Sequence, residues 1–133
     1  MPPRKRTRGS KLRARANKLA LREDPTAIVA KADKRVLELL TELGTDTTKL
    51  HEVSFWLYFP KESQAYKAAA ELERQKFDVE LAPSSDGQSR WLCLVSTLLI
   101  PRFATIDRFR KRFTELAARH GGEFDGWEME VKK

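Results

Sequence analysis

The chain has 133 residues, 41% of them hydrophobic, which suits one domain with one core and excludes a large multidomain protein. Its formal net charge of +7 is concentrated at one end, because residues 1–22 hold nine Lys and Arg residues and no acid. The rest carries 17 bases and 19 acids. The sequence therefore describes a near-neutral domain with a basic arm, and the two parts can have different partners.

The composition also bears on the compartment of the protein. The single cysteine, Cys93, excludes an internal disulfide and fits a reducing cytoplasm. The N-terminus has the positive region of a signal peptide, but no apolar core follows it. The longest apolar stretch, residues 92–100, contains two polar residues and is too short to span a bilayer. We expect a cytoplasmic protein that does not enter a membrane.

Residues 1–24 are predicted to form the basic arm. Its first nine residues offer nothing to bury, and we expect them to be disordered. A basic helix is then expected from Ser10, with Ser10 as its N-cap. At about 100° per residue, four bases of this helix fall on one narrow stripe: Lys11, Arg15, Lys18 and Arg22. Such a stripe could follow a phosphate backbone, an anionic partner surface, or the acidic sheet edges of the domain itself.

Residues 25–133 are predicted to form a single domain that begins with a helix at about residues 26–43. An N-cap and a proline, Asp24-Pro25, start this helix, and Gly44 ends it. After it, apolar spacing of two or of three to four residues marks the other elements. They are a strand at 53–59, a helix at 62–76, a strand at 77–81, an apolar strand at 91–100, a helix from Thr105, and a final strand at 123–131.

The order of these elements predicts an α+β fold. Strand, helix, strand, strand, helix, strand over residues 52–131 is the arrangement of ferredoxin-like domains, an antiparallel sheet with two helices on one face. In that topology the first and third strands are central, and the second and fourth are edges. The two most hydrophobic strands are indeed the first and the third, and outward acids on the other two are a common protection of sheet edges.

The tail predicts a helix end followed by an interrupted strand. Gly121 and Gly122 follow a basic helical run, and glycine is the usual residue at a helix C-terminus. Trp127 and Met129 share one face of the strand, whereas Phe124 has the wrong parity for that face. One extra residue in a bulge at Gly126 would bring Phe124 into line.

The sheet face away from the helices is the predicted contact surface. If Phe55 and Leu57 face the helices, Trp56 and Tyr58 of the same strand point away from the helices. Trp91 and Cys93 can join this outer face, because the pattern of the third strand does not show which of its residues face the helices. Acids surround this centre, so the face suits a basic or mixed peptide whose arginines stack on Trp56 or pair with the rim. The predicted contact set is Trp56, Tyr58, Asp78, Glu80, Asp125, Glu128 and Glu130.

A simpler interpretation remains open: the helix at 26–43 could cover Trp56 and Tyr58, because its own apolar face must be buried somewhere.

Enzyme signatures are absent from the sequence. His51 and His120 have no partner at ligand spacing, so we expect no metal site, and no phosphate-binding or dinucleotide motif predicts a cofactor. Cys93 in the middle of a strand is typical of a buried small hydrophobe. Binding is therefore a better interpretation than catalysis.

Three segments resemble the regulator of ribonuclease E activity B family. They are residues 55–60 (Phe-Trp-Leu-Tyr-Phe-Pro), the alanine-rich helix leading into residues 77–79, and above all residues 121–128 (Gly-Gly-Glu-Phe-Asp-Gly-Trp-Glu). The likeness covers about residues 33–131. It implies a ferredoxin-like domain that binds the non-catalytic scaffold of ribonuclease E and restrains its activity without being an enzyme. We carry over the domain and the inhibitor-type binding, and not the identity of the partner.

Two functions are therefore expected. The first is a non-enzymatic, protein-binding regulator of RNA processing or decay, whose partner is a ribonuclease scaffold or a similar basic segment. The alternative is a nucleic-acid-binding protein that acts through Lys11, Arg15, Lys18 and Arg22. The two functions are compatible, and the sequence leaves the oligomeric state open.

Overall fold

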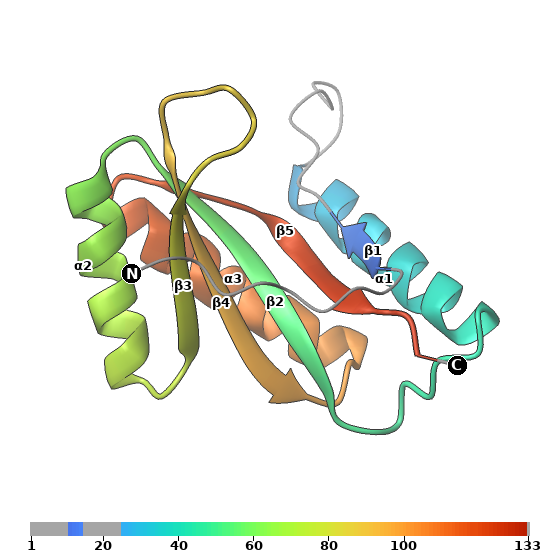
Figure 1. The fold of residues 1–133 in the computed structure, drawn as a ribbon. Coiled ribbons are helices and arrows are strands. Elements are labelled where there is room, and N and C mark those ends of the chain that lie inside the picture. The colour runs from blue at the N-terminus through green and yellow to red at the C-terminus, as the bar shows by residue number, and fades with distance from the viewer. Residues whose placement is uncertain (1–10, 15–24, 133) are drawn as a thin grey trace.

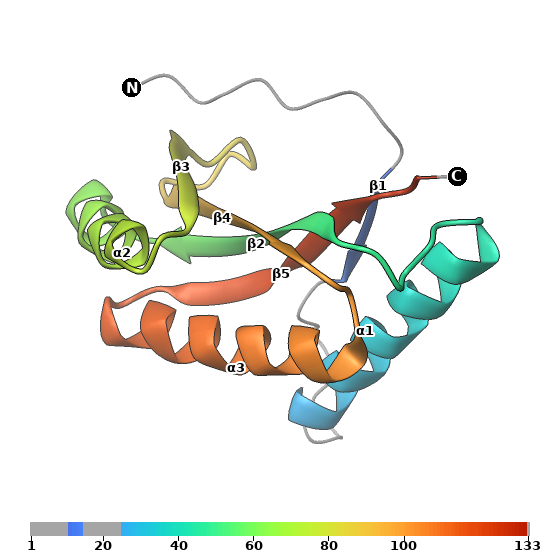
Figure 2. The same ribbon diagram turned by 90° about the horizontal axis from the view of Figure 1, so that it is seen from below.

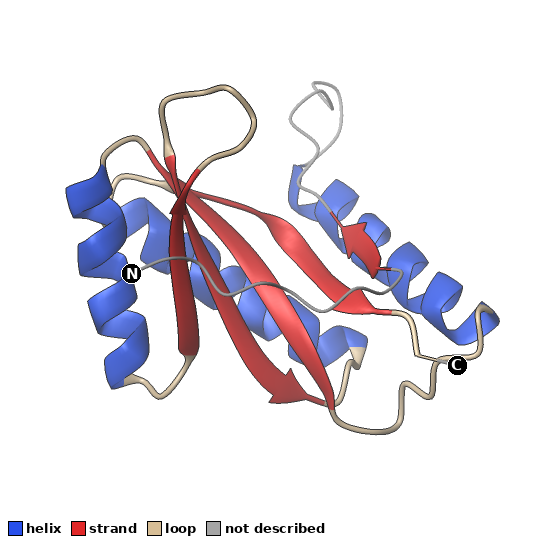
Figure 3. Ribbon diagram, in the orientation of Figure 1, coloured by secondary structure: helices blue, strands red, loops and turns tan. Residues whose placement is uncertain are grey.

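In the described part of the chain, three helices combine with one antiparallel sheet of five strands. The structure, a computed structural model, describes residues 11–14 and 25–132, and side chains from residue 31 onward (Figures 1 and 3). The helices are α1 (Pro25–Glu42), α2 (Glu62–Arg74) and α3 (Phe103–Arg119). The strands are β1 (Lys11–Ala14), β2 (His51–Phe59), β3 (Asp78–Pro83), β4 (Trp91–Leu99) and β5 (Glu123–Glu130). The α+β class expected from the sequence is confirmed.

The strands lie in the order β1-β5-β2-β4-β3. As predicted, β2 and β4 occupy the middle, and β3 has a described neighbour on one side only. The prediction that β5 is an edge strand is wrong, because β1 pairs antiparallel with it.

The prediction of a helix starting at Ser10 is also wrong for its first turn. Lys11–Ala14 is extended, and its backbone pairs with β5, whose outer N–H and C=O groups would otherwise lack strand partners. A helical stripe through Lys11 therefore does not exist. Arg15, Lys18 and Arg22 lie outside the described residues.

The described helices α1, α2 and α3 pack on the same side of the sheet (Figure 2). Alternate residues of β2 point to that side, and α2 and α3 cover them with small and aromatic side chains. Val36 and Leu40 of α1 belong to the same core. The interpretation that this helix covers Trp56 and Tyr58 is therefore wrong, since those two residues have the opposite parity on β2.

A buried polar cluster fixes α1 in this position. The Asp33 carboxylate accepts hydrogen bonds from Trp127 Nε1 of β5 at 2.8 Å and from Arg110 Nε of α3 at 3.1 Å. The side chains of Asp33 and Arg110 are 1% and 7% exposed, and Arg110 also pairs with Asp107. Burial raises the pKa of the Asp33 carboxyl, although the bonds from Trp127 and Arg110 act against this. The cluster joins three elements that are distant in the sequence.

The parity of β4 is settled by its register. Trp91 and Cys93 pair with Phe59 and Leu57, so they face the helices, and the suggestion that they join the outer face is wrong. The alternate residues of β4, including Leu94, take the outer positions instead. Apolar residues on both faces are expected of a central strand, which explains why the sequence alone was ambiguous.

The predicted bulge in β5 is confirmed. Phe55 pairs with Trp127 and Leu57 pairs with Phe124. Between these two pairs β5 therefore contains one residue more than β2. Gly126 has a φ of +118°, which residues with a Cβ rarely adopt. The extra residue brings Phe124 and Trp127 onto the same buried face, as the alternation pattern required.

An ion pair between α2 and α3 gives a prediction for acid pH. Arg119 donates to both carboxylate oxygens of Glu71, at 3.0 and 3.1 Å, and these bonds lower the pKa of Glu71 from its usual 4.5. The contribution of this pair to stability is therefore present above about pH 4.5 and is lost as the pH falls through the lower pKa of the folded state. Because the Arg119 side chain is 55% exposed, we expect the ion pair to contribute no more than about 1 kcal/mol to the free energy of unfolding.

Unfolding free energies of the natural chain and the Glu71→Gln variant, measured at about pH 6 and about pH 3, test this prediction. The difference between the two proteins should shrink at the lower pH. A difference that grows on acidification would contradict it.

Candidate protein-binding face

The strand register brings the predicted contact residues together on the face away from the helices. One row of Cα partners crosses the five described strands, from Arg13 through Glu128, Ser54 and Ser96 to Asp78. In its middle the hydroxyl groups of Ser54 and Ser96 form a hydrogen bond of 2.9 Å. The row therefore has small polar residues at its centre, with an acid on each side.

A second row carries the aromatic part of the face. Trp56 pairs with Leu94, which in turn pairs with Glu80 of β3. The Trp56 and Tyr58 rings lie 6.4 Å apart between centroids. On the other side of Trp56, the register places Asp125 at the bulge of β5. An apolar centre with carboxylates on both sides is thus the character of this face.

We call this surface the acidic sheet face and define it by the predicted contact set together with Glu123. Its members are Trp56, Tyr58, Asp78, Glu80, Glu123, Asp125, Glu128 and Glu130.

The members of the acidic sheet face differ in accessibility. Asp78 is exposed, whereas Tyr58, Asp125 and Glu128 are each less than a tenth exposed. The remaining members are intermediate. A partner would therefore first meet the acids on β3, and access to Glu128 requires some rearrangement of its surroundings.

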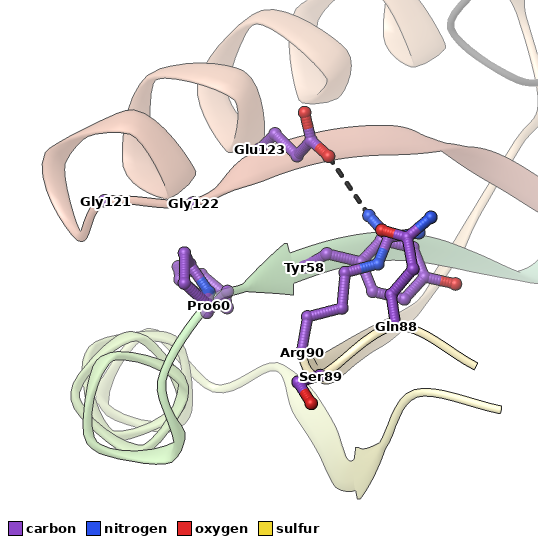
Figure 4. Close-up of a pocket in the computed structure, with 9 residues that line it drawn as sticks. Tyr58, Pro60, Gln88, Ser89, Arg90, Gly121, Gly122 and Glu123 are labelled. Carbon is purple, nitrogen blue, oxygen red and sulfur yellow. Dashed lines mark hydrogen bonds and ion pairs between the residues drawn. The ribbon is translucent and has the colours of Figure 1, made fainter. Parts of the chain in front are cut away.

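At one end of the face, Arg90 shows how the surface accepts a guanidinium group. Its guanidinium carbon lies 3.8 Å from the centroid of the Tyr58 ring. Its Nη1 donates to Glu123 Oε1 at 3.1 Å (Figure 4). Its Nε and Nη2 both donate to Oδ2 of Asp86. Hydrogen bonds from Ser84 and from Arg90 lower the pKa of Asp86. Stacking on an aromatic ring combined with carboxylate pairing is the mode of recognition that favours arginine over lysine.

Arg90 borders a cavity of about 450 Å³. Tyr58 and Pro60 form part of its wall, and the backbone at Gly121 and Gly122 closes it near Glu123 (Figure 4). The cavity opens beside the acidic sheet face and extends it beyond the end of β2. It is large enough to admit a side chain of a bound segment.

Sequence reasoning missed Arg90 and Glu123 as members of the site. Glu123 could have been found, because counting back through the predicted bulge aligns it with Tyr58, as the register confirms. Arg90 follows a turn-forming segment, and no periodic pattern indicates where its side chain points. Arg90 belongs to the site because the chain after this turn passes close to Tyr58, so that the guanidinium group lies over the Tyr58 ring.

Other kinds of site find little support in the described part of the chain. Among residues with described placement, no three His, Cys, Asp or Glu side chains gather in a way that could hold a metal ion. Burial raises the pKa of the Cys93 thiol to about 12, which makes it a poor nucleophile. None of the helices in the described ranges is both long and apolar enough to cross a bilayer.

Comparison with known proteins now identifies the domain. The model of the family described as Regulator of ribonuclease activity B matches residues 30–129. The chain belongs to this family. No curated protein matches the chain. Membership in the Regulator of ribonuclease activity B family confirms the resemblance noted in the sequence and assigns the chain to the regulation of ribonuclease activity.

The range matched by the Regulator of ribonuclease activity B family includes most of the acidic sheet face but not β1. It begins within α1 and ends one residue before the last residue of β5, so it includes every member of the acidic sheet face except Glu130. β1 lies outside it. The family match therefore covers β2 to β5, and β1 is not part of the matched range.

Proposed function

We propose that this protein is a non-enzymatic regulator that restrains a ribonuclease by binding a basic, arginine-containing segment on the acidic sheet face. The segment belongs to the ribonuclease or its scaffold, and the non-catalytic scaffold of ribonuclease E is the first candidate. The observation that carries the proposal is Arg90, which stacks on Tyr58 and pairs with Glu123 of this face. A guanidinium group of a partner would find the same chemistry further along the surface, at Trp56.

Charge supports a basic partner. Within the described strands, the outer positions of β3 and β5 carry the acids Asp78, Glu80, Glu128 and Glu130. Carboxylates on both sides of an aromatic centre attract an extended basic segment and fix its register, and like charge would repel RNA phosphates. Ribonuclease restraint through a protein contact therefore fits the face better than restraint through its RNA substrate.

The proposed fold class follows from the same sheet. We propose that β2 to β5 with α2 and α3 form a ferredoxin-like unit, extended by α1 and β1. The order β5-β2-β4-β3, together with a helix after β2 and another after β4, supports this proposal.

Reversing two charges on β3 tests the proposed function. The variant with Asp78→Lys and Glu80→Lys should bind the ribonuclease E scaffold at least about tenfold more weakly, because two attractive contacts become repulsive. It should also relieve inhibition of RNA cleavage to a similar extent. Calorimetric titration and an RNA cleavage assay with the full enzyme measure the two effects.

The matched control reverses two acids elsewhere. Glu62 and Glu115 are exposed residues of α2 and α3, and the variant with Glu62→Lys and Glu115→Lys has the same net charge as the test variant. It should bind as the natural chain does. Equal loss in both variants would mean that only the overall charge matters, and unchanged binding by the β3 variant would reject the acidic sheet face.

A further inference from the structure

A basic segment of this chain already lies along the sheet, next to the proposed site. In the pairing of β1 with β5, Lys11 is the Cα partner of Glu130 and Arg13 is the Cα partner of Glu128. Opposite charges at directly paired positions favour such a register. β1 therefore brings basic residues to the edge of the acidic sheet face.

The residues that precede β1 match the face in charge and in length. Residues 1–10 contain four bases and no acid: Arg4, Lys5, Arg6 and Arg8. Ten extended residues reach at most about 33–36 Å. Crossing from β1 to β3 takes four steps of about 4.8 Å between neighbouring strands, or about 19 Å. The segment is thus long enough to reach Asp78 and Glu80 on β3.

The burial on this face fits a covered surface. Leu94 is 3% exposed and Glu128 is 7% exposed, although the described helices all pack on the other face. Arg90 in turn shows that a guanidinium group of this same chain binds to the Tyr58 ring and a carboxylate of the face. The N-terminal arginines have the same chemistry as Arg90.

We propose that residues 1–10, anchored beside the acidic sheet face by β1, are an internal competitor that occupies this face and is displaced by the basic partner. The proposal rests on the proposed function for the identity of the competing ligand. A segment attached to its site by a short linker acts at an effective concentration in the millimolar range. If the face is covered nine-tenths of the time, the affinity of the partner falls about tenfold.

Cross-linking tests the occupancy without any partner. Lys5 is the single lysine among residues 1–10, and a carbodiimide joins a lysine amine directly to a carboxylate that it contacts. In the full-length monomer, Lys5 should be joined to Asp78, Glu80 or Glu128. A Lys5→Arg variant keeps the charge of the arm and should lose these products. Products that join Lys5 only to the helix acids Glu62 or Glu115, or no intramolecular product, would overturn the proposal.

Binding of a simple basic probe tests the competition. The probe is a synthetic peptide of alternating arginine and serine, titrated against the full chain at low salt. The variant with Arg4→Ser, Lys5→Ser, Arg6→Ser and Arg8→Ser should bind the peptide about tenfold more tightly, because the face is then uncovered. A control removes the same charge from exposed helix and loop positions through Lys67→Ser, Arg74→Ser, Arg102→Ser and Arg108→Ser, and it should bind like the natural chain.

The outcomes separate the two proposals. Unchanged or weaker peptide binding by the arm variant overturns the internal competitor, and so does an equal gain in the control. Loss of binding to a short RNA, with peptide affinity unchanged, would show the arm to be a nucleic-acid-binding element and would equally overturn it. If the peptide and cross-linking results hold but the β3 charge reversal leaves ribonuclease binding intact, the competitor stands and the proposed function fails.

Discussion

Replacing Asp33 with alanine is expected to lower the free energy of unfolding by about 3–5 kcal/mol. The change removes the acceptor of both Trp127 Nε1 and Arg110 Nε, and the Arg110 side chain is only 7% exposed. Among the described residues, Asp107 would remain as the ion-pair partner of the buried guanidinium, and a buried indole N–H would lose its hydrogen bond to Asp33. Urea unfolding followed by circular dichroism measures the loss.

Two further variants make the test specific. Asp78→Ala removes an exposed carboxylate and should change stability by no more than about 0.5 kcal/mol. Asp33→Asn keeps an acceptor for Trp127 but removes the charge that compensates Arg110, so its effect should lie between the other two. If Asp33→Ala were as stable as Asp78→Ala, the buried cluster would not be what fixes α1 on the sheet.

Replacing Gly122 with alanine should destabilise the domain by about 3 kcal/mol, at the upper end of what overpacking costs. A Cβ at this position would lie 2.3 Å from the carbonyl oxygen of Tyr58 and 2.4 Å from the Phe59 ring. Both belong to the central strand, which cannot move aside without breaking its pairing with β4. The same change should disturb the cavity beside Arg90. Thermal unfolding and calorimetry measure the loss of stability.

Gly87→Ala is the matched control for Gly122→Ala. Gly87 has a φ of +81°, yet nothing lies within 4 Å of the position of its Cβ. Its replacement should therefore show only the backbone strain of a left-handed residue, about 1–2 kcal/mol. A larger loss at Gly87 than at Gly122 would contradict the close approach of β5 to β2.

Much of the fold could be predicted because it depends on local alternation. The strand at β2, the bulge at Gly126 and the glycine-terminated end of α3 each leave a pattern within about ten residues. The residues of the contact set on β2, β3 and β5 followed from the same parity. The side of the sheet on which Trp91 and Cys93 lie could not be predicted in this way, because a strand buried on both faces lacks alternation.

The rest depends on contacts that are distant in sequence. The side on which α1 packs is fixed by Asp33 with Arg110 and Trp127, 77 and 94 residues away. β1 forms because β5 offers an edge, whereas the spacing of its own bases fits a helix equally well. The place of Arg90 over Tyr58 likewise depends on how a turn returns to the sheet. No local pattern contains this information.

The bulge at Gly126 acts as a phase shift within β5. It lets Glu123 before it and Glu128 after it lie on one face, while Phe124 and Trp127 both enter the core. Loss of one residue here would force a carboxylate into the core at one end of the strand or an aromatic ring out at the other. Substitutions along β5 are local events, but a change of length alters the whole strand. Selection should therefore preserve the spacing of residues 121–130, and relatives should differ there by replacement and not by insertion or deletion.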